Sequence, residues 1–223
     1  MRIKFEFIQS LFPKKVEGQI REEMGLVGSI YPEERELIKY AIDKRQREFA
    51  AGRLCAKEGL RELGITDFPI LKDHKGAPIW PPGIGGSISH ARGCCAAIVA
   101  RVNERESLGL DIEKIDRLDS NLWGHLFVQK EIKWLKSMGD EAQKYASIQF
   151  SAKEAFYKAQ YLLTHSWLGF KDVMIEIKET EEKFILHLLI DIGEWKKGTE
   201  FQGKYKLFEG YVASGIWIDE NSI

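Results

Sequence analysis

The stretch that most constrains the fold is Leu-Gly-Leu-Asp-Ile-Glu, in which apolar and acidic side chains alternate. In a β-strand this period of two places Leu108, Leu110 and Ile112 on one face, towards a core. Asp111 and Glu113 then share the other face, where their charges repel each other. A bound Mg²⁺ would relieve that repulsion, because this ion prefers oxygen ligands. From this stretch alone, a half-buried strand with a solvated acidic face is the simpler alternative.

Composition limits the class of protein. With 33 Lys and Arg against 34 Asp and Glu in 223 residues, the chain has no overall charge bias, so a general nucleic-acid binder is not expected. No apolar run approaches the roughly 20 residues of a membrane span, and no signal peptide is expected. The three cysteines, at positions 55, 94 and 95, indicate neither a disulfide framework nor a zinc site. They favour a reducing, cytoplasmic location.

Hydrophobic periodicity predicts a mixture of helices and strands, in one large domain or two smaller ones. A helix is predicted to begin at Pro32 and to run, with a break, to Leu63, where Gly64 ends it. Two further helices are predicted at 117–138 and 141–163, and strands at 1–8, 94–102, 108–113, 173–177, 184–190, 200–208 and 211–218. The last four strands are predicted to form an antiparallel sheet. The polar segment 102–107 is the predicted domain boundary.

The helix at 141–163 carries a second group of charged side chains. Glu154 and Lys158 are four residues apart and therefore share a face, and Lys153 lies about 100° round from Glu154. An ordinary ion pair on a solvated helix is one explanation. A third carboxylate beside two lysines would also suit a metal-bound diphosphate, since carboxylates take Mg²⁺ and ammonium groups take the remaining phosphate oxygens.

A third candidate group is Ser-Ile-Ser-His, which ends at His90 and precedes a turn containing glycine. A hydroxyl, an imidazole and free backbone N–H groups can together hold a phosphate. A histidine hydrogen-bonded in the core is the alternative for His90. A serine–histidine hydrolase is not favoured, because Ser89 and His90 are adjacent on a strand and point to opposite faces. No P-loop and no dinucleotide-binding glycine motif occurs in the sequence.

Taken in order, five motifs resemble those of the 4′-phosphopantetheinyl transferases, in particular the two-lobed group that activates the surfactin and enterobactin synthetases. The motifs are Arg45 with Glu48–Arg53, Gly76–Pro81, Gly86–His90, Leu108–Glu113 and Ser151–Lys158. The tryptophan–proline pair in the second motif, and Trp167–Phe170 after the last, are closer to the enterobactin branch. Each motif alone is weak, but five in this order and spacing are specific.

The resemblance implies an α+β fold of two similar α/β lobes with pseudo-twofold symmetry. Each lobe would be a small, mostly antiparallel sheet packed with helices, and the active site would lie in the cleft between them. The N-terminal lobe, 1–105, would hold the 3′-phosphate and adenine of coenzyme A. The C-terminal lobe, 106–223, would supply the Mg²⁺-binding carboxylates and the catalytic helix. The resemblance also implies a monomer.

The activity implied is transfer of the 4′-phosphopantetheine arm of coenzyme A to a serine of an apo acyl, peptidyl or aryl carrier protein, with release of adenosine 3′,5′-bisphosphate. Siderophore or other nonribosomal peptide synthesis is the expected setting. By the resemblance, the Mg²⁺ ligands would be Asp111, Glu113 and Glu154, and the phosphate-neutralising lysines Lys153 and Lys158. Glu154 would also accept the serine proton, directly or through a water.

The remaining contacts to coenzyme A are implied in the same way. His90, Arg53 and Arg45 would grip the 3′-phosphate, and Ser89 the pyrophosphate. The loop of Lys75, Gly76 and Pro78 would cover the adenine.

Three positions depart from the family pattern. Ala77 stands where several relatives have lysine, for which Lys75 would substitute, and Arg92 and the Cys94–Cys95 pair are unusual after the histidine. A Mg²⁺-dependent phosphohydrolase or pyrophosphatase would use the same carboxylates, but it gives no reason for the glycine–proline loop. A non-catalytic module that binds coenzyme A or a carrier has no need of all three acids and both lysines.

Overall fold

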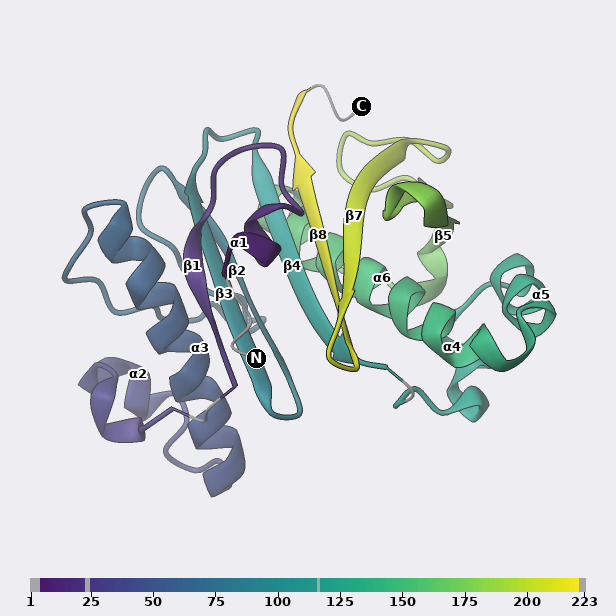
Figure 1. The fold of residues 1–223 in the computed structure, drawn as a ribbon. Coiled ribbons are helices and arrows are strands. Elements are labelled where there is room, and N and C mark those ends of the chain that lie inside the picture. The colour runs from purple at the N-terminus through teal and green to yellow at the C-terminus, as the bar shows by residue number, and fades with distance from the viewer. Residues whose placement is uncertain (1–4, 23–24, 116, 221–223) are drawn as a thin grey trace. The chain divides into compact units, whose positions relative to one another are not determined.

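The computed structural model describes residues 5–22, 25–115 and 117–220. Their contacts divide the chain into two compact units, one ending at Glu104 and the other beginning at Arg105. Each unit has one antiparallel sheet and one long helix packed on it (Figure 1). This architecture confirms the predicted α+β class. None of the helices in the described ranges is long and apolar enough to cross a bilayer.

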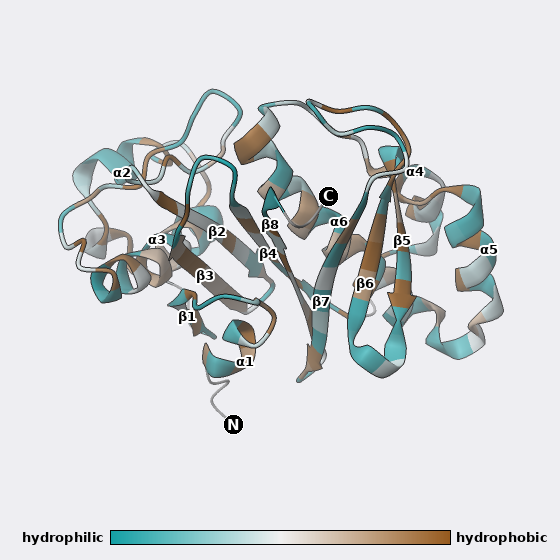
Figure 2. Cartoon of the chain, turned by 90° about the horizontal axis from the view of Figure 1, so that it is seen from above, coloured by the Kyte–Doolittle hydropathy of each residue, from teal (hydrophilic) through white to brown (hydrophobic). Residues whose placement is uncertain are grey.

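The first unit is built on a three-stranded sheet in the order β1–β3–β2. Its strands are β1 (Glu17–Arg21), β2 (Ile84–Ala91) and β3 (Cys94–Arg101). Strand β3 lies in the middle and is buried along almost its whole length, which explains its continuous run of small apolar residues (brown in Figure 2). The long helix α3 (Asp43–Glu62) covers the sheet.

Glycines allow α3 to approach the sheet closely. A Cβ atom at Gly59 would lie 2.9 Å from the Glu17 carbonyl oxygen, and one at Gly52 would lie 2.7 Å from the Ile88 side chain. A side chain at either position would push the helix off the sheet. The unit also contains α1 (Phe5–Gln9), the 3₁₀ turn η1 (Val27–Ser29) and α2 (Pro32–Glu36).

The second unit is built on a five-stranded sheet in the order β4–β8–β7–β6–β5. Its strands are β4 (Ser107–Lys114), β5 (Val173–Lys178), β6 (Lys183–Leu188), β7 (Glu200–Phe208) and β8 (Tyr211–Ile218). The long helix α6 (Ala142–Thr164) packs mainly on β4 and β8. The shorter elements of this unit are η2 (Ser120–Leu122), α4 (Trp123–Leu126), α5 (Gln129–Ser137), η3 (Gly139–Glu141), η4 (Phe170–Asp172) and η5 (Glu179–Glu181).

The core of the second unit lies between the sheet and α6. Apolar side chains of alternate residues on β5 to β8 meet Ala152, Ala155, Phe156 and Ala159 of the helix. The alternation of buried and less buried residues along β6 is the period of two that the sequence predicted. The antiparallel arrangement of the last four strands is confirmed.

Two predictions near the N-terminus are wrong. A strand was predicted at 1–8, but Phe5–Gln9 is helical, and residues 1–4 lie outside the described ranges. The first strand of the sheet is instead Glu17–Arg21, where no strand was predicted. This strand is half-buried throughout and has no apolar alternation, so its pairing with β3 places it in the sheet.

Candidate functional site

The organising feature of the second unit is the close contact between β4 and α6. A Cβ atom at Gly109 would lie only 1.9 Å from the Ala155 carbonyl oxygen. Two residues earlier, the Ser107 hydroxyl donates to the Ala159 carbonyl oxygen at 2.9 Å. Because side chains alternate along a strand, Asp111 and Glu113 lie on this same face, towards α6. The face that carries the carboxylates is therefore the helix-covered core face.

Leu108, Leu110 and Ile112 are buried on the opposite face, with at most 1% of their surface exposed. The predicted separation of apolar and acidic side chains is thus correct. The prediction of a solvated acidic face as the simpler alternative is wrong, since Asp111 is only 6% exposed.

Lys158 of α6 is paired with the first carboxylate. Its Nζ atom lies 2.7 Å from Asp111 Oδ1 and also donates to the Leu110 carbonyl oxygen at 3.2 Å. The lysine is thus held by the strand and not by Glu154 on its own helix.

The other two carboxylates are near enough to influence each other's protonation. Burial raises the pKa of Glu154, the Lys158 charge opposes this, and the charges of Asp111 and Glu113 raise it further. Burial also raises the pKa of Glu113, and the charge of Asp111 adds to the effect. The structure thus brings Glu154 of α6 into one electrostatic group with Asp111 and Glu113 of β4, which are more than 40 residues earlier in the sequence.

These acids have the donor chemistry of a Mg²⁺ site, since carboxylate oxygens are hard ligands and their mutual repulsion favours a cation. Within the described ranges, however, no group of three His, Cys, Asp or Glu side chains is arranged to hold a metal ion. Glu113 Oε1 accepts a hydrogen bond from the Lys114 amide and lies 3.9 Å from Arg117. Asp111 Oδ1 is taken by Lys158. The residue types fit the ion, and the carboxylates would have to turn towards it.

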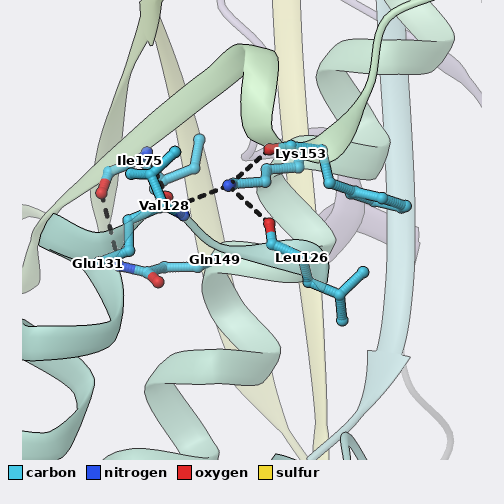
Figure 3. Close-up of polar contacts among 7 residues, drawn as sticks. Leu126, Val128, Glu131, Gln149, Lys153 and Ile175 are labelled. Carbon is cyan, nitrogen blue, oxygen red and sulfur yellow. Dashed lines mark hydrogen bonds and ion pairs between the residues drawn. The ribbon is translucent and has the colours of Figure 1, made fainter. Parts of the chain in front are cut away.

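Lys153 makes its hydrogen bonds inside the second unit. It was expected beside the phosphates, but it is only 2% exposed and its ammonium group points into the protein (Figure 3). Its Nζ atom donates to Glu131 Oε2 at 2.8 Å and to the carbonyl oxygens of Leu126 at 3.0 Å and Phe170 at 2.8 Å. An ammonium group has three protons, so none remains for a phosphate. Burial lowers the pKa of Lys153, and the Glu131 charge opposes this.

In the first unit, helix α3 and strand β2 bring together two of the predicted phosphate ligands. Arg45 Nη1 lies 2.8 Å from His90 Nε2. Arginine can only donate, so His90 Nε2 is the acceptor in this contact. Glu48 Oε2 is 3.4 Å from the same imidazole nitrogen and 3.7 Å from Arg45. Arg45 and His90 are partly exposed, as ligands of an incoming anion must be.

Arg53 lies deeper in the same unit, with 6% of its surface exposed. Its Nε donates to the Ile70 carbonyl oxygen at 2.8 Å, and its guanidinium lies 4.1 Å from the centre of the Phe49 ring. Burial lowers the pKa of Arg53 to about 10, Glu34 opposes this, and the Arg45 charge lowers it further. Arg45, Arg53 and His90 therefore form one basic cluster.

Ser89 does not join this cluster through the same face of β2. Ile88 packs with α3, so its neighbour Ser89 points to the other face of the strand and is 3% exposed. His90 returns to the face of Ile88. The structure therefore places Ser89 and His90, two expected ligands that are adjacent in sequence, on opposite faces of the strand.

The glycine–proline loop is a tight turn organised by Asp73. Its Oδ1 atom accepts hydrogen bonds from the backbone amides of Lys75 and Ala77, each at 2.9 Å. Gly76 has a positive φ of 92°, which explains glycine at this position. Lys75 and Gly76 are exposed and Pro78 is half-buried. These hydrogen bonds give the loop a defined shape.

Sequence reasoning missed three acids that position these groups: Glu48, Asp73 and Glu131. The spacing Asp-x-x-Gly is a turn signal that could have identified Asp73. Glu131 is the third residue of α5 and caps its start by accepting from the Val128 amide at 2.8 Å. No local pattern marks its pairing with Lys153, which is 22 residues away.

Comparison with known proteins agrees with this geometry in both units. The 4′-phosphopantetheinyl transferase N-terminal domain family matches residues 33–100, and the 4′-phosphopantetheinyl transferase superfamily matches residues 107–213. Among curated proteins, the 4′-phosphopantetheinyl transferase PptT of Mycobacterium tuberculosis is 36% identical over 193 residues, covering 83% of this chain and 84% of that protein.

Two other relatives extend the comparison. The 4′-phosphopantetheinyl transferase Npt of Nocardia iowensis is 34% identical over 219 residues, covering 94% of this chain and 98% of that protein. Enterobactin synthase component D of Escherichia coli K12 is 32% identical over 152 residues, covering 67% of this chain and 70% of that protein. On these matches, the chain belongs to the 4′-phosphopantetheinyl transferase superfamily.

Proposed function

We propose that this protein transfers the 4′-phosphopantetheine arm of coenzyme A to a serine of an apo carrier protein. The observation that carries the proposal is the group formed by Asp111, Glu113, Glu154 and Lys158, in a chain matched over both units by one family. Such a group supplies carboxylates and an ammonium at one place, which is what transfer of a phosphoryl group needs.

The reaction exchanges one oxygen on phosphorus for another. The serine hydroxyl oxygen of the carrier bonds to the phosphorus that bears the pantetheine arm. The bond from that phosphorus to the bridging pyrophosphate oxygen breaks, and adenosine 3′,5′-bisphosphate leaves with the electron pair. The serine proton must go to a base, and the departing phosphate must be neutralised.

We assign the proton to Glu154 and the neutralisation to Lys158. Glu154 is a carboxylate on α6 within the same electrostatic group as Asp111, Glu113 and Lys158, so it can accept a proton from a hydroxyl brought to this group. Lys158 is fixed by Asp111 and the Leu110 carbonyl oxygen, so its charge is in place before the bond breaks.

Asp111, Glu113 and Glu154 would hold Mg²⁺, which when bound supplies charge to the pyrophosphate oxygens. Their donor chemistry and mutual repulsion support this assignment. We assign the 3′-phosphate to Arg45, Arg53 and His90, supported by their common basic cluster. The adenine is assigned to Lys75, Gly76 and Pro78, and a pyrophosphate oxygen to Ser89.

The enterobactin-type relatives support a carrier domain of siderophore or other nonribosomal peptide synthesis as the substrate. A monomeric enzyme in the cytoplasm remains our prediction from the sequence. A small panel of apo acyl, peptidyl and aryl carrier domains would identify the preferred substrate.

Mass spectrometry of the carrier tests the proposal. With coenzyme A and Mg²⁺, the apo-carrier should gain about 340 Da, the mass of the transferred arm. EDTA should prevent the gain. Hydrolysis of coenzyme A with no carrier modified would instead indicate a phosphohydrolase, and coenzyme A binding without either reaction would indicate a binding module.

A further inference from the structure

The buried pair of Glu131 and Lys153 joins separate segments of the second unit. Lys153 reaches the end of α4 through the Leu126 carbonyl oxygen and the start of η4 through that of Phe170. Glu131 Oε1 accepts from the Ile175 amide of β5 at 2.8 Å, while Oε2 accepts from the Val128 amide and from Lys153 (Figure 3). The two side chains thus fix α6 to α4, α5 and β5.

The first unit contains a pair with the same plan. Glu34, 3% exposed, stands at the third position of the short helix α2 and accepts from the Tyr31 amide at 3.0 Å. Its other carboxylate oxygen accepts from the Ile70 amide at 2.8 Å. Arg53 of the long helix α3 lies 4.0 Å from this oxygen.

The two pairs also correspond in a hydrogen bond from the cation to the segment that follows each long helix. Arg53 donates to the carbonyl oxygen 17 residues later, that of Ile70, and Lys153 donates to the one 17 residues later, that of Phe170. In each unit an acid that caps a short helix and a cation on the long helix both hold the backbone of the segment that follows the long helix. We refer to Glu34–Arg53 and Glu131–Lys153 as the two clamps.

The two clamps differ in how many N–H groups of the cation the clamp leaves unused. The three protons of Lys153 are all donated within its clamp. Guanidinium has five N–H groups, and the hydrogen bond of Arg53 to Ile70 uses only the one on Nε. An arginine can therefore serve a clamp and an anion together, whereas a lysine in this position serves the clamp alone.

From this correspondence we infer that Lys153 is a positioning residue, which with Glu131 fixes the part of α6 that carries Glu154, and does not contact coenzyme A. The inference rests on the proposed function for the role of Glu154. Glu154 follows Lys153 directly, so a loss of the clamp would let this turn of α6 shift relative to β4. A displacement of about 1 Å can cost roughly 100-fold in rate when reacting groups must be aligned.

Three variants test the inference: Glu131→Gln, Lys153→Met and the two combined. If Glu131 and Lys153 act as a clamp, each variant should lower kcat for carrier modification by about 10- to 100-fold. The combined variant should be no worse than the worse single one, because the two side chains act as a unit. The affinity for coenzyme A in EDTA, measured by calorimetry, should stay within about twofold of the unmodified protein.

A direct phosphate contact predicts a different pattern. Lys153→Met would then weaken coenzyme A binding in EDTA by about tenfold or more, and Glu131→Gln would not. That result would overturn the inference. If either single variant fails to fold because one buried charge is left unpaired, the combined variant, which removes both charges, supplies the same two measurements.

A pair near the surface, where Lys144 is partly buried and Glu141 is exposed, provides the matched control at the N-terminal end of α6. Lys144 is paired with Glu141, and Lys144→Met with Glu141→Gln should leave kcat and coenzyme A affinity unchanged. If the unmodified protein modifies no carrier, the proposed function fails. The coenzyme A measurements in EDTA would still show whether Lys153 contacts the ligand.

Discussion

Lys158 Nζ lies 2.7 Å from Asp111 Oδ1, so that a helix cation and a strand carboxylate are joined across the β4–α6 contact. Asp111 is buried, and the lysine is only partly exposed. The pair therefore places a positive charge among carboxylates at a fixed position. In the proposed reaction this is the charge that meets the leaving phosphate.

Replacing Lys158 by Met should lower kcat by about 100-fold or more, since it removes a prepositioned charge at the leaving group. The expected change in KM for coenzyme A is smaller. Steady-state rates of carrier modification, measured by liquid chromatography, separate the effect on kcat from the effect on KM. A variant with full kcat and a raised KM would show that Lys158 serves only to bind the substrate.

Gly109→Ala should destabilise the second unit strongly. The new Cβ would lie 1.9 Å from the Ala155 backbone oxygen, which cannot move without α6, and overpacking of this kind costs about 1–3 kcal/mol or more. Urea unfolding followed by circular dichroism measures the change.

Gly124→Ala is the control for this substitution, because its Cβ would meet nothing within 4 Å and alanine favours the helix. We expect its unfolding midpoint to be unchanged or slightly raised. Equal midpoints for the Gly109 and Gly124 variants would contradict the close β4–α6 contact.

The raised pKa of Glu154 predicts a pH-dependent stability in the absence of metal. A carboxyl group whose pKa is higher in the folded than in the unfolded state contributes stability below its unfolded value of about 4.5. This contribution is lost as the pH rises through the folded pKa, because the charged form is buried. The free energy of unfolding in EDTA should therefore fall as the pH rises above about 4.5.

Glu154→Gln should reduce this fall and make the metal-free protein more stable than the unmodified one at neutral pH. Urea titrations at several pH values measure both effects. The opposite result would be a free energy of unfolding that rises with pH in the unmodified protein, and rises more than in the variant. That result would contradict the burial of a charged Glu154. Such a gain in stability on loss of a functional charge is common at active sites.

The basic cluster predicts discrimination between coenzyme A and 3′-dephospho-coenzyme A. Arg45→Ala should weaken binding of coenzyme A by about 10- to 100-fold, as expected for a charged hydrogen bond. It should hardly affect the dephosphorylated form, which lacks the group that Arg45 would contact. Calorimetry with the two ligands gives the ratio.

Arg47→Ala serves as the control, because Arg47 is on the same helix and exposed but is paired with Asp43 at 3.0 Å. The ratio of its affinities for coenzyme A and 3′-dephospho-coenzyme A should match that of the unmodified protein. If Arg45→Ala weakens both ligands equally, the 3′-phosphate is held elsewhere.

The sequence predicted the elements with strong periodicity and the acids that lie on them. Strands β6 and β7 follow from alternation, and the shared face of Asp111 and Glu113 follows from a period of two. The polar strand β1 was missed because its place depends on pairing with β3, which no local pattern reveals. Likewise, alternation at 1–8 suggested a strand where the structure has a helix.

Lys153 illustrates a second limit. Helical spacing gives the angle between Lys153 and Glu154, but it does not say whether a long side chain turns outward or into the protein. That choice depends on Glu131, Leu126 and Phe170, which are distant in sequence. Helical spacing therefore singled out the residue but could not indicate its hydrogen bonds to Glu131, Leu126 and Phe170.

The transfer is tested most directly by the mass of an apo-carrier domain after incubation with coenzyme A, Mg²⁺ and one of two variants of this protein. The variants are Glu154→Gln and Glu141→Gln. Glu141 is an exposed acid at the start of the same helix. We predict that the Glu141 variant adds the phosphopantetheine arm at the unmodified rate, and that the Glu154 variant adds none although it is folded and binds coenzyme A. Equal modification by the two variants would contradict the assignment of the transfer to the Asp111, Glu113 and Glu154 group.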